Sequence, residues 1–255
     1  MDNVLLSKNI ENELHYRDFV FNDADKHLVH KMLYEINALG YNFQYLAELD
    51  AYKVPGSGRI ILKFIHQFIS EATRAYLLPQ LVLDRIENCD ETLVQLYLHF
   101  KASEEYISKP GKPAPAHIYV RYDNGFSKLK SKKIEKNLLE LARYPRDAFY
   151  LPFTMRMLAK WKAPEMLDLL MEYLDGSNIT LQSLGMEETV DSVYYPPIQF
   201  IKRELVFTAI DGLTHYPSAI VYETIKSLLA NSDKDIRLAA TKAMRVLEKI
   251  SPQAY

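Results

Sequence analysis

The stretch SDKDIRLAATKAMRVLEKI, residues 232–250, decides the fold of this chain. Its opening turn carries Asp233 and Asp235, and acidic side chains at a helix start stabilise the unpaired backbone amides there. The apolar residues that follow recur at three- and four-residue spacing, which predicts an amphipathic helix. They combine small residues, which let a neighbouring helix approach closely, with larger ones that fill space: Ala239, Ala240 and Ala243, and Ile236, Met244 and Leu247. Arg237 is expected to reach a carboxylate or a carbonyl of the adjoining turn.

Helical spacing dominates the rest of the sequence as well. The chain has 255 residues but only 8 glycines, and its apolar residues mostly follow the three- and four-residue period, so we expect an all-α protein. One stretch departs from this pattern. HIYVRYDNGF, residues 117–126, alternates apolar and polar residues and contains the turn signal Asn124-Gly125. Because no second alternating segment offers it a sheet, we predict an extended arm there.

Composition and charge limit the classes of function. Hydrophobic residues make up 48% and charged residues 25% of the chain, as in ordinary globular proteins. The net charge of -2 gives no global positive field that would attract nucleic acid or an anionic membrane. Cys89 is the only cysteine, which excludes an intrachain disulfide and fits a reducing compartment. We therefore expect a cytoplasmic protein that does not enter a membrane.

The pattern of residues 232–250 recurs upstream, within the C-terminal half. Aligning the apolar positions places Asp147 on Asp235. Each of the longer helices is expected to follow a shorter one, and Pro164 and Pro217 are suited to open two of these shorter helices, because a first helical turn does not need the amide that proline lacks. Repeated helix pairs predict a stack in which neighbouring pairs share one apolar interior.

The run PSAIVYETIKSLLANSDKDIRLAATKAMRVL, residues 217–247, resembles the HEAT repeat family of α-solenoids. It matches the family pattern of proline, apolar helix, acidic turn, Ile-Arg, alanine pair and leucine. In that family the matching acid and arginine form a ladder between repeats, which implies that Asp235 and Arg237 are framework residues. A second alignment places Arg203 on Arg237. The resemblance implies an α-α superhelix of HEAT-like helical hairpins.

The resemblance covers residues 164–250 and weakens upstream. In residues 130–161, Phe149 stands where the arginine is expected and Pro152 interrupts the alanine pair. Because the resemblance covers less than half of the chain, it implies a helical array and leaves the function open.

The sequence suggests three segments. Residues 1–108 read as a divergent helical N-terminal region, with one helix over 22–40 and a long apolar helix over 57–78. Pro79 is suited to open a further helix. Residues 109–127 read as a proline-rich linker or arm, because SKPGKPAPAH cannot remain helical. Residues 128–255 read as the HEAT-like helical repeats.

The insert over residues 176–197 is the candidate binding element. Structureless inserts of this length are uncommon and usually bind partners or are disordered, and in repeat arrays they cluster on one face. The other interpretation is a mobile loop or a cap over the array's own edge. Acidic residues and interface-favouring tyrosines form the predicted protein-binding set: Glu187, Glu188, Asp191, Tyr194 and Tyr195.

A basic segment over residues 109–136 supports a second hypothesis. Cations interleaved with aromatic residues are typical of surfaces that bind single-stranded nucleic acid through phosphate contacts and base stacking. The other interpretation is a solvated charge run. The candidate nucleic-acid residues are Arg121, Tyr122, Lys128, Lys130, Lys132 and Lys133.

Enzyme chemistry finds little support. His27 and His30 have a spacing that two metal ligands can use, but no motif supplies the remaining ligands. We assign no catalytic residue, no metal site and no cofactor. The sequence therefore predicts a non-enzymatic protein-binding α-solenoid that uses its curved face and the 176–197 insert. It would be an adaptor or an inhibitor, such as a bacterial immunity-type protein with an acidic surface that blocks a basic toxin nuclease. The alternative is a helical-repeat protein that binds nucleic acid.

Overall fold

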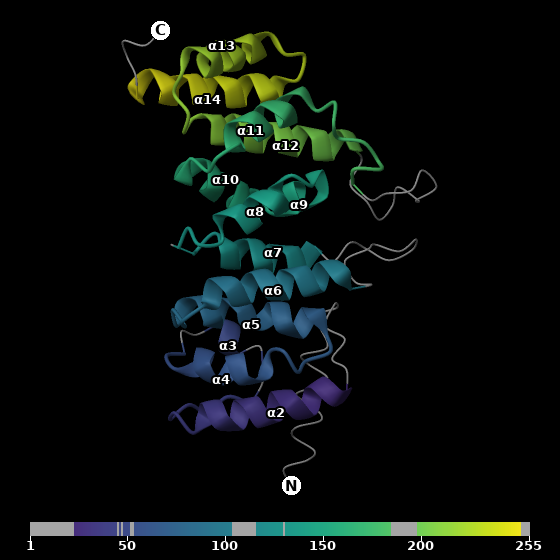
Figure 1. Cartoon of the computed structure of the whole chain (residues 1–255), viewed down its shortest axis with the longest axis vertical. Coiled ribbons are helices and arrows are strands. Elements are labelled where there is room, and N and C mark those ends of the chain that lie inside the picture. Colours follow the sequence, from purple (N-terminus) through teal and green to yellow (C-terminus); the bar gives the residue numbers. More distant parts are fainter. Residues whose placement is uncertain are drawn as a thin grey trace. The chain divides into compact units, whose positions relative to one another are not determined.

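Helices make up all the regular structure of the described residues, so the predicted all-α class is confirmed (Figure 1). The computed structural model describes residues 23–44, 46, 48–51, 54–103, 116–129, 131–184 and 198–250. The chain forms two compact units, with Met1–Tyr106 and His117–Lys130 in unit 1, and Ile107–Ala116 and Ser131–Tyr255 in unit 2. No helix in the described ranges is both long and apolar enough to cross a membrane.

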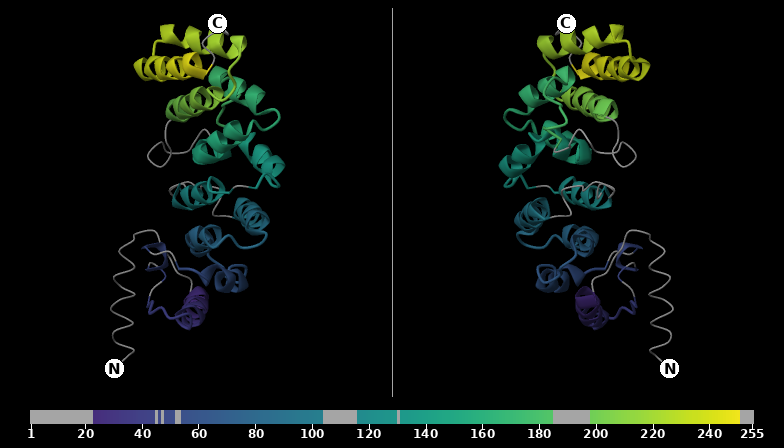
Figure 2. Two further views of the ribbon diagram at one scale, coloured as in Figure 1. Left: turned by 90° about the vertical axis from the view of Figure 1, so that its left-hand side faces the viewer. Right: turned by 90° about the vertical axis from the view of Figure 1, so that its right-hand side faces the viewer.

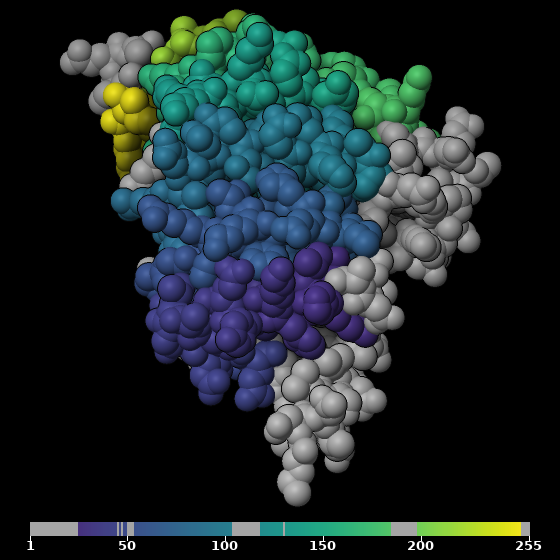
Figure 3. Space-filling view, turned by 60° about the horizontal axis from the view of Figure 1, so that its bottom comes forward, coloured from purple at the N-terminus to yellow at the C-terminus, as the bar shows by residue number. Residues whose placement is uncertain are grey.

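Unit 1 is built from short helices that pack mainly against their neighbours in the chain. They are α2 (Asp23–Asn37), α3 (Glu48–Ala51), α4 (Ser57–Phe64), α5 (Glu71–Leu83), α6 (Cys89–Ala102) and α7 (Ala116–Phe126). Helix α4 packs against α2 and α5, and α5 also packs against α3 and α6. Figure 3 shows the closely packed surface that α2 (purple) and the following helices (blue) form. The helix predicted over 22–40 is confirmed as α2.

The prediction of one continuous helix over 57–78 is wrong, because the helical run is interrupted between α4 and α5. The Asp25 carboxylate accepts hydrogen bonds from the backbone amides of Ile69 and Ser70 at 2.7 and 2.9 Å. The Ser70 hydroxyl then caps α5 by accepting from the amide of Thr73 at 3.3 Å. Pro79 lies inside α5 and does not open a helix. A contact with a residue far away in sequence, Asp25, thus ends one apolar run and starts the next helix.

The prediction of an extended arm over 117–126 is also wrong, because these residues lie in α7. Five aromatic rings from α6 and α7 are fully buried against one another. They form the aromatic core of unit 1: Tyr97, Phe100, Tyr119, Tyr122 and Phe126. Gly125 lets the helices approach, because a Cβ there would lie 2.9 Å from Leu93 Cδ2.

Unit 2 also consists of consecutive helices that pack against their neighbours (Figure 2). They are α8 (Glu135–Ala142), α9 (Pro145–Tyr150), α10 (Pro152–Trp161), α11 (Met166–Asp175), α12 (Ile198–Leu213), α13 (Ala219–Ser227) and α14 (Lys234–Ile250). Helix α12 is central, because it packs against α9, α10, α11 and α14. Its Gly212 permits this crowding, since a Cβ there would meet Leu170 Cδ1 at 2.9 Å and the Ala159 Cβ at 3.4 Å. Pro152 lies in the first turn of α10.

The helical hairpin predicted at the C-terminal end is confirmed by α13 and α14, which pack against each other. The Asp233 carboxylate accepts hydrogen bonds from the amides of Asp235 and Ile236, as expected of an acidic capping turn. Arg237 donates to the carbonyls of Asn231 and Ser232 at 2.7 and 2.9 Å, so its guanidinium holds the turn.

The small and large apolar residues of α14 mostly lie where the helical period puts them. Ala240, Ala243, Met244 and Leu247 are buried. The shorter helices begin later than their prolines predict: α11 begins at Met166, and α13 begins at Ala219 with the Ser218 hydroxyl as its cap.

Candidate functional site

An open groove in unit 2 lies between the first half of α12 and the turn that leads into α14. Figure 1 labels both helices. Its volume is about 510 Å³. The α12 side contributes basic, polar and apolar side chains, and the other side contributes the acidic turn and one isoleucine: Gln199, Phe200, Lys202, Arg203, Val206, Asn231, Ser232, Asp233 and Ile236. We refer to it as the α12–α14 groove.

Phe200 and Arg203 give this groove its chemical character. Phe200 is 40% exposed, and its ring meets that of Phe149 edge to face with the centroids 6.2 Å apart. The Arg203 guanidinium lies 5.5 Å from the Phe200 ring centroid and 6.0 Å from that of Phe207. Arg203 Nε is buried and has no hydrogen-bond partner within the described ranges. A cation near two phenylalanine rings, one of them exposed, suits an acidic and apolar ligand segment.

The five residues predicted to bind a protein partner, Glu187, Glu188, Asp191, Tyr194 and Tyr195, lie outside the described residues. The first part of the predicted insert, residues 176–184, is described. Ile179 and Leu184 are buried there, and Gly176 ends α11 with a positive φ of 66°. This part of the insert therefore belongs to the core of unit 2.

The structure buries the aromatic member of the predicted nucleic-acid set. Tyr122 is 0% exposed and cannot stack on a base from within the core of unit 1. Arg121 is half-buried, with its guanidinium 4.5 Å from the Tyr76 ring centroid.

The lysines of this segment are divided between the two units. Lys128 is exposed in unit 1, Lys132 and Lys133 are exposed in unit 2, and Lys130 lies outside the described residues. The Lys132 ammonium donates to the Trp161 carbonyl at 2.9 Å and so links the segment before α8 to the end of α10.

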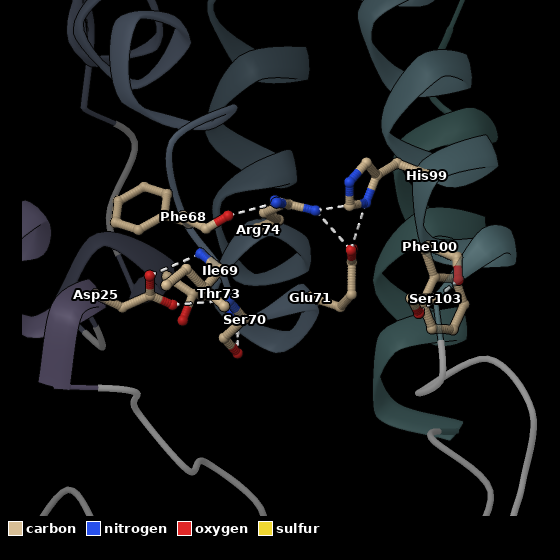
Figure 4. Close-up of polar contacts among 10 residues, drawn as sticks. All are labelled: Asp25, Phe68, Ile69, Ser70, Glu71, Thr73, Arg74, His99, Phe100 and Ser103. Carbon is tan, nitrogen blue, oxygen red and sulfur yellow. Dashed lines mark hydrogen bonds and ion pairs between the residues drawn. The ribbon is translucent and has the colours of Figure 1, made fainter.

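A second polar group lies inside unit 1, where α5 faces α6 (Figure 4). Arg74 Nη1 donates to Glu71 Oε1 at 2.5 Å and lies 2.6 Å from His99 Nδ1. His99 Nδ1 is in turn 2.7 Å from Glu71 Oε1, and Arg74 Nη2 donates to the Phe68 carbonyl. The side chains of Arg74 and Glu71 are 8% and 3% exposed, whereas that of His99 is 60% exposed. We call Glu71, Arg74 and His99 the buried triad, although its histidine faces solvent.

The electrostatics of the buried triad follow from its burial. Desolvation raises the pKa of Glu71, and the nearby Arg74 and His99 only partly offset that rise. Burial also raises the pKa of Tyr122 well above its usual range, and the Glu71 charge raises it further. His99 Nδ1 can donate to Glu71 when it carries a proton and accept from Arg74 when it does not. Either tautomer therefore keeps a partner, and the imidazole is held in place.

Sequence reasoning missed the buried triad. Glu71 and Arg74 fall inside the run that we predicted as one long helix. This prediction concealed the helix start at Glu71, after the first apolar residues of the run. The signal was Ser70 followed by an acid, a common helix N-terminus. His99 lies on another helix, so no spacing in the sequence could connect it to α5.

His27, His30 and Cys89 carry side chains that can bind metals or act as nucleophiles, and the described residues place none of them in such a site. His27 and His30 are exposed on α2, and the described residues contain no group of three or more histidine, cysteine or acidic side chains arranged to hold a metal ion. Burial raises the pKa of Cys89 to about 12, and Asp90 and Glu91 contribute to the rise. A thiol with such a pKa is protonated at neutral pH and is a poor nucleophile.

Comparisons with known proteins do not assign the chain to a family: no family model, no curated protein and no solved structure matches it.

Proposed function

We propose that this chain is a non-enzymatic protein-binding protein, an adaptor or an inhibitor that acts in the cytoplasm. In this proposal the helical hairpins of unit 2 are HEAT-like repeats of an α-solenoid. The observation that carries it is the α12–α14 groove, where Phe200 is exposed beside Lys202 and Arg203. Aromatic and arginine side chains dominate the energetics of protein interfaces. The basic side chains favour a partner segment that is acidic and apolar.

The predicted insert is the second contact surface of this proposal. Its acidic residues and tyrosines, Glu187, Glu188, Asp191, Tyr194 and Tyr195, directly precede α12 in the sequence, and α12 supplies one wall of the groove. The bacterial immunity-type version requires this acidic set, because it would face a basic nuclease surface. An adaptor that binds an acidic segment requires the groove instead.

Replacing Phe200 by alanine together with Arg203 by alanine is expected to weaken partner capture at least tenfold, because both interface anchors are lost. The measurement is a quantitative pull-down from the native cell with the partner identified by mass spectrometry, followed by binding of the purified partner. The matched control is Phe153→Ala with Arg156→Ala, a second exposed phenylalanine whose ring lies 5.6 Å from an arginine in unit 2 but outside the groove. Equal capture by both double variants and the parent chain would contradict a groove-based function.

A second arm tests the insert on its own. Replacing the three acids by glutamine and the two tyrosines by serine removes its charge and aromatic area, while Ile179 and Leu184, which are buried, remain. Loss of capture with this variant alone would support the immunity-type version, and loss with the groove variant alone would support the adaptor.

Nucleic-acid binding through the basic segment is the alternative proposal, and a salt titration distinguishes it. Several lysine–phosphate contacts would make the logarithm of the binding constant fall steeply with the logarithm of the salt concentration. With Lys128, Lys132 and Lys133 replaced by glutamine, we expect no change in retention on single-stranded DNA, because Tyr122 is buried and cannot add stacking energy. If the parent chain shows a steep salt dependence that flattens in this variant, nucleic-acid binding would become the preferred function.

A further inference from the structure

The two walls of the α12–α14 groove carry opposite charges. On the α12 wall, the side chains of Lys202 and Arg203 have no ion pair or hydrogen bond with any other part of the described chain. On the α14 wall, Asp233 uses Oδ1 to accept the amides of Asp235 and Ile236, and within the same described ranges its Oδ2 has no partner. The groove therefore offers two uncompensated cations on one wall and an available acceptor on the other.

Phe200 and Arg203 set the spacing of the groups that a ligand would have to match. The Arg203 guanidinium lies 5.5 Å from the Phe200 ring centroid, and the ring is 40% exposed. In an extended segment, side chains two residues apart project to the same side about 6.7 Å from each other, whereas adjacent side chains point to opposite sides. An acidic residue and a large apolar residue at positions i and i+2 can therefore contact the guanidinium and the ring together.

Asp233 on the opposite wall favours an extended ligand over a helical one. The backbone amides inside a helix are bonded within that helix, so a helical ligand has none to give to this carboxylate. An extended segment presents free amides, and a hydrogen bond from an amide to a charged acceptor is stronger than one between neutral groups. The α12 wall runs from Gln199 to Val206. At 1.5 Å per residue it is about 10 Å long, which accommodates about three extended residues.

We propose that the α12–α14 groove binds a short extended segment of a protein partner that carries an acidic residue and a large apolar residue two positions apart. This inference rests on the proposed protein-binding function and specifies its ligand. The acidic side chain pairs with Arg203 and Lys202, because charge-assisted bonds to a guanidinium are among the strongest that a surface can offer. The apolar side chain packs on Phe200 and Ile236, and a backbone amide of the segment donates to Asp233.

Titration of the isotope-labelled full chain with a synthetic heptapeptide, followed by nuclear magnetic resonance, tests the proposal. The peptide carries one glutamate and one leucine separated by a serine, with glycine and serine on both sides. We expect saturable shifts confined to the amides of residues 199–206 and 231–236, with a dissociation constant of about 1 mM or lower, since two side chains anchor the peptide. Replacing the glutamate of the peptide by lysine should weaken binding at least tenfold, because the cations of the groove then repel it.

Variants of the chain assign the effect to the groove. Arg203→Gln and Phe200→Ala are each expected to weaken binding of the heptapeptide about tenfold, the effect of losing one interface anchor. The matched control is Arg245→Gln, which removes an exposed arginine of α14 that does not line the groove. It should leave the affinity unchanged, and the spectrum of each variant without peptide verifies its fold.

Three results would overturn the assigned ligand: no saturable shifts, equal binding of the lysine peptide, or tighter binding of a helical alanine-rich peptide with glutamate and leucine three residues apart. The capture experiment with the Phe200→Ala and Arg203→Ala double variant separates this inference from the proposed function. Loss of capture without binding of the heptapeptide means that the groove binds a partner through a different kind of segment. Unchanged capture with binding of the heptapeptide means that the ligand is right and the captured partner uses another surface.

Discussion

Replacing Arg74 by leucine lowers the free energy of unfolding of unit 1 by about 3–5 kcal/mol, because the substitution leaves the Glu71 carboxylate buried without its cation. Both side chains are almost fully buried, and desolvation already raises the pKa of Glu71 despite the arginine. The Phe68 carbonyl also loses its donor. Urea denaturation combined with hydrogen exchange of the α5 amides measures the loss and assigns it to unit 1.

The control for this prediction is Arg143→Leu, which breaks the ion pair with Glu165. The side chains of that pair are 45% and 61% exposed, and exposed pairs contribute no more than about 1 kcal/mol. A double variant, Glu71→Leu with Arg74→Leu, should lose less stability than Arg74→Leu alone, since no uncompensated charge stays buried. Equal losses in Arg74→Leu and Arg143→Leu would show that the triad does not stabilise unit 1.

These experiments concern the part of the molecule that the sequence revealed least. The α13–α14 hairpin could be predicted because its signals are local: an acidic cap at Asp233, an apolar stripe of period 3.6, and an arginine whose partners lie within six residues. The break before α5 could not, since it depends on Asp25, which lies 44 and 45 residues away from the amides it binds. The same reason hides the buried triad, because His99 lies on α6 whereas Glu71 and Arg74 lie on α5.

Residues 117–126 show how two periodicities can coexist in one sequence. Ile118, Val120 and Tyr122 alternate as a strand would require, and Asn124-Gly125 reads as a turn. In α7 Val120 is 53% exposed, whereas Ile118 and Tyr122 are buried, so the helical period holds. The glycine serves close helix contact with Leu93 and no turn. Short segments that fit both patterns are decided by tertiary packing, which the sequence alone does not show.

Phe126→Ala tests this correction directly and is expected to lower the free energy of unfolding of unit 1 by about 3–5 kcal/mol, the cost of removing a buried phenylalanine ring from a packed core. Phe126 is 0% exposed, and its ring centroid lies 5.7 Å from that of Tyr97 and 6.1 Å from that of Tyr122. The residue would contribute little stability if residues 117–126 formed an extended arm. Urea denaturation with hydrogen exchange of the α6 and α7 amides measures the difference.

Tyr34→Ala provides the comparison, because this aromatic residue of the same unit is 80% exposed on α2. Exposed substitutions usually change stability by no more than about 0.5 kcal/mol. A large loss in Phe126→Ala with almost none in Tyr34→Ala means that α7 completes the aromatic core against α6. If both variants are as stable as the parent chain, α7 does not pack on α6, and the extended arm predicted over 117–126 would be the better description of these residues.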